Sequence, residues 1–412
     1  MLYSKLFSKS LKNVKKYDSL NATLLQKGGF IDQVMAGVYS YLPLGLRVLR
    51  KIEHIVRSEM DAIGGQEILM PVLHPKKNWE KTNRWDNMDI LFKLKGAGDK
   101  DFALGPTHEE IVTPLAQKMV FSYKDLPVVV YQIQDKFRNE PRAKSGILRG
   151  REFIMKDMYS FHTSEKDMDV FYEQVERAYE TIWQRLGIDK ITLKTYASGG
   201  SFSKYSHEYQ TLCDTGEDII YICDKCNVAI NKEIVSEHKA CIQCGNKDLT
   251  EKKAIEAGNI FKLKTKFSDA FNFKFTDKDG KEKGVEMGCF GLGVTRVMGI
   301  LAECFNDDKG LIWPESVSPY KVHLIGLNLE DEEIKQKTFD VYEKLQSAGV
   351  DVLFDDRENM SAGEKFADAD LVGITWRAVS SKRTGDKIEV KKRRDAEGKL
   401  MPIQDLLKMV AD

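Results

Sequence analysis

Two long strand-like segments joined by a short basic connection constrain the fold of this chain most. Residues 127–138 and 151–161 both alternate in side-chain character, so each segment has two distinct faces. Only residues 139–150 separate them, and we therefore expect the two segments to pair as antiparallel neighbours in a sheet. One face of the second segment carries Arg151, Phe153, Met155, Asp157 and Tyr159.

The remaining patterns predict an α+β protein whose C-terminal part is a small α/β domain. Apolar residues at three- and four-residue spacing predict helices over 45–63 and 166–186, and residues 259–275 have a strand-like pattern. Beyond Trp313-Pro314, which is typical of a linker, strand and helix patterns alternate. The strands expected there are 320–327, 350–354 and 388–391, and the helices are 331–346, 362–372 and 404–410.

Four of the seven cysteines form two Cys-x-x-Cys pairs separated by 14 residues. Each pair supplies two thiolates from one tight turn, and two such turns close a tetrahedron around zinc. The ligand set would be sulfur only, which is typical of a structural zinc and leaves no open position for a reactive water. Four free thiols in a surface insertion, about residues 222–248, are the alternative. The ligands in question are Cys223, Cys226, Cys241 and Cys244, whereas Cys213, Cys289 and Cys304 are expected to be buried thiols.

The charge of the chain is informative only when it is counted locally. The 412 residues include 63 basic and 63 acidic residues, and the zero balance argues at first against a polyanionic partner. Residues 377–399, however, hold nine basic and four acidic residues, and residues 138–151 hold five basic residues and one acidic residue. Such clusters are what phosphate groups bind. No apolar run approaches the length of a membrane span, and the N-terminal residues lack the apolar segment of a secretory signal.

The basic connection begins with Phe137-Arg138-Asn139-Glu140. Arg138 and Glu140 by themselves are explained by a surface ion pair. The further arginines and lysine nearby favour a site for phosphates and a planar base, because guanidinium groups bind phosphate through two hydrogen bonds and an aromatic ring stacks on a base. These additional cations are Arg142, Lys144, Arg149 and Arg151.

Residues 105–110 read Gly-Pro-Thr-His-Glu-Glu and support two interpretations. Thr107 and Glu110 match a capping box, which would open a helix over 111–121 without any function. That motif leaves Glu109 unexplained, and a carboxylate beside a hydroxyl is suited to receive a cationic amine. We expect Glu109 to bind such an amine.

Residues 288–296 form a glycine-rich segment that we expect to be a turn leading into a helix. No Gly-Lys-Ser/Thr follows, so the segment is not a P-loop, and it is not a Rossmann fingerprint. Close helix packing explains the glycines about as well as ligand binding does. Arg296, one turn inside the helix, is placed to reach a phosphate near the helix start.

Taken together, these motifs resemble the bacterial-type prolyl-tRNA synthetases, a family of class II aminoacyl-tRNA synthetases. The resemblance covers nearly the whole chain and rests on several separate motifs. They are the segment from Gly37 to Pro71, residues 105–110, the pair 136–140 and 149–157, residues 287–296, and the C-terminal signature 355–357 with 363–371.

The resemblance implies an antiparallel-sheet catalytic domain over 1–316 and an anticodon-binding domain over 317–412. It implies that Arg138 holds the α-phosphate of ATP and the proline carboxylate. For ATP, it implies that Glu140 contacts the adenine amino group, that Phe153 stacks on adenine, and that Arg149 and Arg296 hold the γ-phosphate, with Mg²⁺ accompanying the nucleotide. For proline, it implies that Thr107 and Glu109 accept the imino nitrogen and that Met155, Asp157 and Tyr159 line the pocket.

The same resemblance implies that Arg142 approaches the acceptor stem of tRNA(Pro), that the protein is a homodimer through its first motif, and that it is cytoplasmic. The family usually carries a large editing domain between its second and third motifs. Here about 30 residues, 227–256, occupy that place, which is too few for such a domain, and we expect no editing of mischarged alanine in cis.

Smaller departures are a longer segment at 199–208, Lys264 where a glycine is usual, and Thr375 where a proline is usual. Two other classes of protein remain as alternatives. One is another class II synthetase, of threonyl or glycyl type, and the other is a non-catalytic tRNA-binding paralogue. The presence of Arg138, Glu140 and Arg296 argues against the paralogue, which would tend to lose them. A zinc-ribbon nucleic-acid binder would explain only the insertion.

Overall fold

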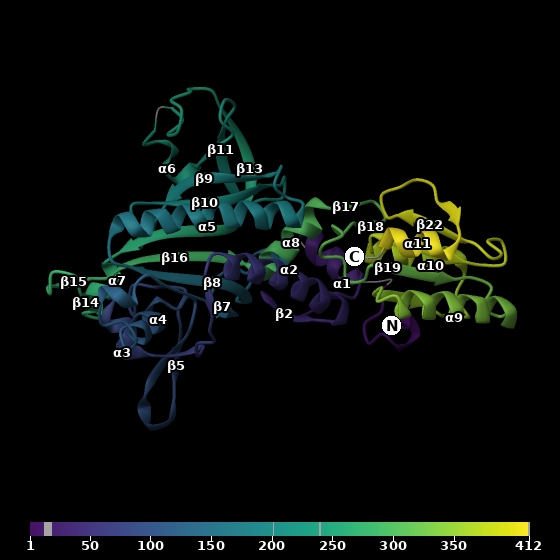
Figure 1. The fold of residues 1–412 in the computed structure, drawn as a ribbon, viewed down its shortest axis with the longest axis horizontal. Coiled ribbons are helices and arrows are strands. Elements are labelled where there is room, and N and C mark those ends of the chain that lie inside the picture. The colour runs from purple at the N-terminus through teal and green to yellow at the C-terminus, as the bar shows by residue number, and fades with distance from the viewer. Residues whose placement is uncertain (12–18, 201, 239, 411–412) are drawn as a thin grey trace. The chain divides into compact units, whose positions relative to one another are not determined.

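The computed structural model describes residues 1–11, 19–200, 202–238 and 240–410. These form two compact units, which Figure 1 shows with their elements labelled. The larger unit consists of residues 35–38 and 52–300, and the smaller one of residues 1–34, 39–51 and 301–412. Helices α2 (Pro43–Ala62) and α8 (Val294–Cys304) have residues in both.

A nine-stranded sheet organises the larger unit, with the strand order β10-β9-β12-β11-β13-β16-β8-β7-β3. Its first five strands in that order are β10 (Tyr205–Leu212), β9 (Thr192–Ser198), β12 (Ala229–Asn231), β11 (Asp218–Cys223) and β13 (Leu249–Lys264). The other four are β16 (Glu286–Gly293), β8 (Glu152–His162), β7 (Val128–Phe137) and β3 (Gln66–Glu67).

The register of β7 and β8 confirms the expected antiparallel pair. Val128 lies opposite Phe161 and Phe137 opposite Glu152, so the two strands match along their full length. The next strand, β16, pairs with the other edge of β8 and sets Gly293 opposite Met155 and Gly291 opposite Asp157. Met155 and Asp157, on one face of β8, therefore lie opposite glycines, which have no side chain. This leaves space above that face of the sheet for a ligand.

Helix α5 (Glu165–Leu186) packs against β8, β13 and β16. Ser164 caps its first turn by accepting a hydrogen bond from the backbone of Asp167, and Gly187 ends it with a φ of 73°. Smaller elements complete the unit: α3 (Lys76–Lys81), α4 (Glu109–Ala116), α6 (Lys232–Val235), α7 (Lys266–Ala270), the sheet of β4 (Leu73–Pro75), β6 (Asp101–Leu104) and β5 (Phe92–Lys95), and the hairpin of β14 (Lys274–Thr276) and β15 (Glu282–Gly284).

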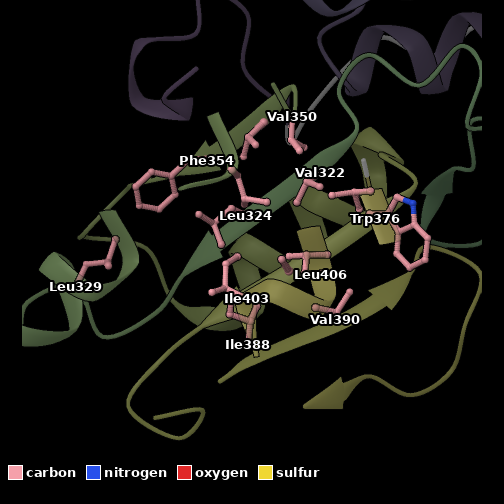
Figure 2. Close-up of a cluster of buried hydrophobic side chains, with 14 residues drawn as sticks. Val322, Leu324, Leu329, Val350, Phe354, Trp376, Ile388, Val390, Ile403 and Leu406 are labelled. Atoms are coloured by element: carbon pink, nitrogen blue, oxygen red, sulfur yellow. The ribbon is translucent and has the colours of Figure 1, made fainter. Parts of the chain in front are cut away.

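A five-stranded sheet in the order β20-β19-β21-β22-β23 forms most of the smaller unit. Apolar side chains of this sheet make a core in which Leu324, Phe354 and Leu406 are fully buried (Figure 2), and Ile325, Val379 and Ala369 make a second, smaller cluster. The strands are β20 (Val352–Asp355), β19 (Val322–Gly326), β21 (Trp376–Ser380), β22 (Ile388–Lys392) and β23 (Lys399–Met401). The other elements are α1 (Leu20–Lys27), β1 (Ile31–Met35), β2 (Val38–Tyr41), β17 (Asn306–Asp307), β18 (Gly310–Leu311), α9 (Glu332–Ser347), α10 (Ala362–Val372) and α11 (Ile403–Val410).

The α+β class, the helices α2 and α5 and the C-terminal alternation of strands and helices are confirmed. The strand expected over 259–275 is confirmed for 259–264, in β13, and for 274–275, in β14, but it is wrong between them, where a short helix, α7, lies. Residues 288–293 are also not a turn, since they lie inside β16. Glycine is required there for packing: a Cβ on Gly288 would lie 2.7 Å from the Ser160 hydroxyl oxygen.

Candidate active site

Arg138 lies directly after β7, on the border of two cavities in the larger unit. Its backbone N–H donates to the carbonyl oxygen of Arg151 at 2.8 Å, which fixes the start of the connecting loop. The guanidinium carbon lies 5.1 Å from the centre of the Phe153 ring, and Nε has no hydrogen-bond partner among the described residues. Burial and the positive charge of Arg296 lower the pKa of Arg138. A desolvated cation with donor capacity to spare is suited to bind an anion.

The first cavity, of about 280 Å³, contains most of the predicted proline-binding residues. Thr107, Glu109, Arg138, Phe153, Met155 and Asp157 line it. Tyr159 does not line the cavity but supports it from behind: its hydroxyl donates to Asp157 at 2.9 Å and accepts a hydrogen bond from the backbone of His108. The face predicted on β8 therefore does surround one space.

Glu109 is fully buried in the wall of this cavity. The Thr107 hydroxyl donates to its carboxylate, with oxygen–oxygen distances of 2.7 and 2.8 Å, and the Cys289 thiol donates to it at 3.2 Å. The Arg84 guanidinium lies 3.3 Å from it. The carboxylate thus has fixed partners on the protein side and faces the cavity.

The capping box predicted for Thr107 and Glu110 is wrong. Helix α4 begins at Glu109 after an N-cap at His108 that has no side-chain capping bond, and it ends at Ala116 rather than at 121. The Glu110 carboxylate instead binds Arg84 at 2.9 Å and the Thr82 hydroxyl at 2.8 Å. A buried cation is a stronger partner for a carboxylate than a backbone N–H, and this explains the difference.

Asp157 forms the polar floor of the cavity. Burial raises the pKa of Asp157, but the positive charge of Lys136, at 2.9 Å, and the neighbouring His108 outweigh that effect, so the pKa lies below its usual value. Gln132 also donates to it at 3.0 Å. The carboxylate is therefore ionised at neutral pH and held by hydrogen bonds within the sheet.

Two buried histidines beneath this site predict an acid-sensitive fold. Burial lowers the pKa of His74 to about 4 and that of His108 to about 3. A histidine in the unfolded chain has a pKa near 6.5. Below that pH the unfolded chain takes up protons that the folded chain excludes, so the free energy of unfolding is full above pH 6.5 and decreases as the pH falls below it. We expect the free energy of unfolding to drop by about 2 kcal/mol per histidine between pH 7 and pH 5.

Chemical denaturation at the two pH values measures this effect. His74→Gln should show a smaller drop than the unmodified chain, whereas a change at the exposed His54, to Gln, should leave the drop unaltered. Equal pH dependence in the chain and in His74→Gln would contradict the assignment.

The second cavity, of about 260 Å³, has a wall of alternating charges. Arg149 pairs with Glu140 at 2.9 Å and with Glu217 at 3.4 Å. Arg296 donates to the carbonyl oxygen of Leu148 at 3.0 Å and to the Glu256 carboxylate at 2.7 Å. The structure thus brings Arg138, Glu140, Arg149 and Arg296 together, whereas the predicted tRNA contact Arg142 is exposed in the loop and lines neither cavity.

Sequence reasoning missed several residues of the site. Arg84 and Glu256 come from segments far from the motifs, and nothing in their spacing marks them. Cys289 was expected to be a plain buried thiol, but it donates to Glu109; Cys213 and Cys304 are only partly buried. Of the unusual segment 199–208, Phe202 lines the first cavity and Ser201 lies outside the described residues.

The four cysteines of the insertion come together as predicted. Their sulfur atoms all lie within 4.8 Å of one another, with Cys223 and Cys244 at 3.5 Å and Cys226 and Cys241 also at 3.5 Å. Gly245, directly after the second pair, has a positive φ of 72°, which glycine adopts without strain. Sulfur ligands of one tetrahedral zinc lie at similar separations, because each Zn–S bond is about 2.3 Å long.

No helix in the described part of the chain is long and apolar enough to cross a membrane.

Residues 92–305 match the model of the tRNA synthetase class II core domain (G, H, P, S and T), and residues 321–412 match that of an anticodon binding domain. The fold and the site thus define a class II aminoacyl-tRNA synthetase.

Relatives identify the family within that class. A proline–tRNA ligase of Sulfurihydrogenibium is 34% identical over all of this chain and 99% of its own length. One from a Wolbachia strain is 38% identical, covering 92% of each chain. The chain belongs to the proline–tRNA ligase family.

Solved structures support the same fold. The prolyl-tRNA synthetase of Giardia lamblia in complex with prolyl-adenylate has a TM-score of 0.77 at 19% identity, over 94% of this chain and 75% of that one. The enzyme from Cryptosporidium parvum, complexed with halofuginone and AMPPNP, has a TM-score of 0.77 at 21% identity, over 95% and 75%.

Proposed function

We propose that this protein activates proline with ATP and transfers it to the terminal ribose of tRNA(Pro). The observation that carries the proposal is the placement of a fully buried carboxylate, Glu109, and the guanidinium of Arg138 in one cavity of amino-acid size. An amino acid presents a cationic nitrogen and a carboxylate at fixed separation, and these two side chains have the complementary charges. Arg138 also borders the second cavity, where the nucleotide phosphates would lie.

In this proposal Thr107 and Glu109 accept the imino nitrogen of proline, and Met155, Asp157 and Tyr159 shape the pocket for its ring. Arg138 holds the proline carboxylate against the α-phosphate, so that the carboxylate oxygen attacks phosphorus and pyrophosphate leaves. The ribose hydroxyl of the tRNA then attacks the carbonyl carbon of the adenylate and AMP leaves. The protein contributes chiefly by positioning and charge stabilisation.

For the nucleotide, we propose that Phe153 stacks on adenine and that Glu140 accepts a hydrogen bond from its amino group. Arg149 and Arg296 then hold the γ-phosphate. Both arginines already project into the second cavity, paired with carboxylates that a triphosphate would replace.

Mg²⁺ would enter with ATP. The second cavity offers oxygen ligands of the kind that this ion prefers, from Glu217, Asp218 and Glu256. The ion would neutralise part of the negative charge of the phosphates.

We further propose that Arg142 contacts the acceptor stem of the tRNA and that the domain boundary lies between residues 316 and 317. We also propose that the basic run 377–399 contributes to tRNA binding. Only part of it is free to bind phosphate, because Arg377 pairs with Asp370 and Arg393 with Asp307. Its exposed members are Lys382, Arg383, Lys387, Lys392, Arg394 and Lys399. A cytoplasmic homodimer is part of the same proposal.

Charging of a tRNA(Pro) transcript with labelled proline tests the whole function. We expect prolyl-tRNA to form only when ATP is present. No charging of this transcript by a folded preparation that binds ATP would overturn the proposal.

A structural zinc ion at the four cysteines is a further proposal with a direct test. Metal analysis of protein purified under reducing conditions without chelator should find about one zinc per chain. Cys241→Ser should lower that content and reduce the melting temperature, because the ligand set would no longer close. A zinc content near zero in the unmodified protein would rule out the site.

Absence of editing in cis is also testable. The described residues of 227–256 form β12, α6 and part of β13 and include two of the four clustered cysteines. The alignment with the Sulfurihydrogenibium ligase spans 562 positions against 412 residues here. Each methylene missing from alanine costs only about 1–3 kcal/mol of discrimination, so some alanyl-tRNA(Pro) should form and persist. Rapid deacylation of alanyl-tRNA(Pro) by the purified protein would show this prediction to be wrong.

A further inference from the structure

Arg84 is a buried cation in the wall of the first cavity, and none of the sequence motifs includes it. It follows helix α3 and is only 5% exposed. Its guanidinium carbon lies 5.3, 5.0 and 5.6 Å from the ring centres of Trp79, Phe202 and Phe267. These aromatic rings hold the guanidinium in place.

The same guanidinium contacts two consecutive carboxylates. Nη1 lies 2.9 and 3.2 Å from the oxygens of Glu110 and 3.3 Å from Glu109. Two carboxylates thus share one cation, and one negative charge of this group stays uncompensated. Glu110 is turned away from the cavity, toward Thr82, whereas Glu109 faces it.

Arg138 lines the same cavity and its charge acts on Glu109, but no ion pair joins the two side chains, which leaves Arg138 to the substrate carboxylate. The other ionisable groups around the carboxylates do not alter this balance. Asp157 is paired with Lys136, and burial raises the pKa of both Tyr159 and Cys289 well above its ordinary value, so those two are neutral. Burial lowers the pKa of His108, which is neutral as well, and Lys156 hydrogen-bonds to Tyr179 on α5. Burial and the negative charge of Glu109 raise the pKa of Glu110 to about 7, although the positive charge of Arg84 acts against this rise. A proton taken up by the pair therefore goes to Glu110, and Glu109 keeps its charge.

We propose that Arg84 is a positioning residue for amino-acid recognition: it neutralises Glu110, so that the uncompensated negative charge resides on Glu109, facing the secondary ammonium group of proline. This inference rests on the proposed function. Without Arg84 the two carboxylates share a proton, because two adjacent buried charges of the same sign cannot both persist. Glu109 is then a weaker acceptor for the substrate nitrogen.

The first test is Arg84→Met in proline-dependent ATP–pyrophosphate exchange. The KM for proline should rise at least about tenfold, with a smaller change in kcat and an unchanged KM for ATP. The pH below which the proline KM rises should also move upward, since the carboxylate pair binds its proton more tightly. Arg185→Met removes a guanidinium that pairs with Glu59, and neither residue lines the cavity, so it should change none of these quantities.

The second test is the charge-balanced double variant Arg84→Met, Glu110→Gln. Glu109 is then the sole, uncompensated carboxylate of the group, and the proline KM should return to within about threefold of that of the unmodified chain. Glu110→Gln alone leaves Arg84 to neutralise Glu109 at 3.3 Å, so its proline KM should stay raised. Melting temperatures confirm that each variant is folded, and the comparison of the double variant with the unmodified chain and with Glu110→Gln remains decisive if Arg84→Met alone does not fold.

These experiments distinguish failure of the Arg84 proposal from failure of the proposed function. An unchanged proline KM in Arg84→Met, or a raised KM that Glu110→Gln does not restore, overturns the role of Arg84 while wild-type exchange still supports the function. Absence of proline-dependent exchange in the wild-type protein overturns the function itself.

Discussion

Arg138→Ala should lower kcat/KM for proline activation by about a thousandfold. In the proposed reaction its guanidinium touches both reactants, because it borders the amino-acid cavity and the phosphate cavity. Arg296 lines both cavities too, but it is already paired with the Glu256 carboxylate. Its Nε has no hydrogen-bond partner among the described residues, and the nearby buried Glu256 keeps its ion pair with Arg296, so removal of Arg138 should cost little stability. Steady-state ATP–pyrophosphate exchange measures the loss.

Arg142→Ala is the matched control for this prediction. Arg142 is exposed in the same loop and lines neither cavity, so pyrophosphate exchange should stay near that of the unmodified protein. Transfer to tRNA should weaken instead. If Arg138→Ala kept more than about a tenth of the exchange activity, the assignment of Arg138 would have to be abandoned.

Glu109→Gln should raise the KM for proline by about a hundredfold. The change removes the charge that faces the substrate nitrogen but preserves the shape of the side chain. It also removes the repulsion between Glu109 and Glu110, so the melting temperature should stay the same or rise. The proline KM from exchange kinetics and the melting temperature together separate a binding defect from a folding defect.

Glu251→Gln provides the control. This exposed carboxylate lies on β13 and accepts a hydrogen bond from the Tyr221 hydroxyl, and it does not line the first cavity. Its proline KM should not change. A Glu109→Gln variant with the proline KM of the unmodified chain would show that Glu109 is not the acceptor of the imino nitrogen.

Local patterns predicted the parts of the site that lie on regular strands. Alternation along 151–161 placed Phe153, Met155 and Asp157 on one face, and strand geometry alone brings such residues to one cavity. The cysteine cluster was predictable for a similar reason, because both pairs lie in tight turns with fixed ligand spacing.

The residues that local patterns missed depend on tertiary contacts. Thr107 and Glu110 match a capping box, yet the buried Arg84 takes Glu110 as its partner, and no local rule contains that guanidinium. The glycines of 288–293 are typical of a turn, but they lie within a strand, where crowding by Ser160 of β8 leaves no room for a side chain at Gly288. Both errors arose where packing between distant segments outweighs the local preference.

Amino-acid-dependent ATP–pyrophosphate exchange, run with proline, alanine and threonine side by side, measures directly whether this protein activates proline. We expect strong exchange with proline, weaker exchange with alanine, which lacks two methylenes of the ring, and none above background with threonine. Exchange with threonine in place of proline, or with none of the three, would contradict this expectation.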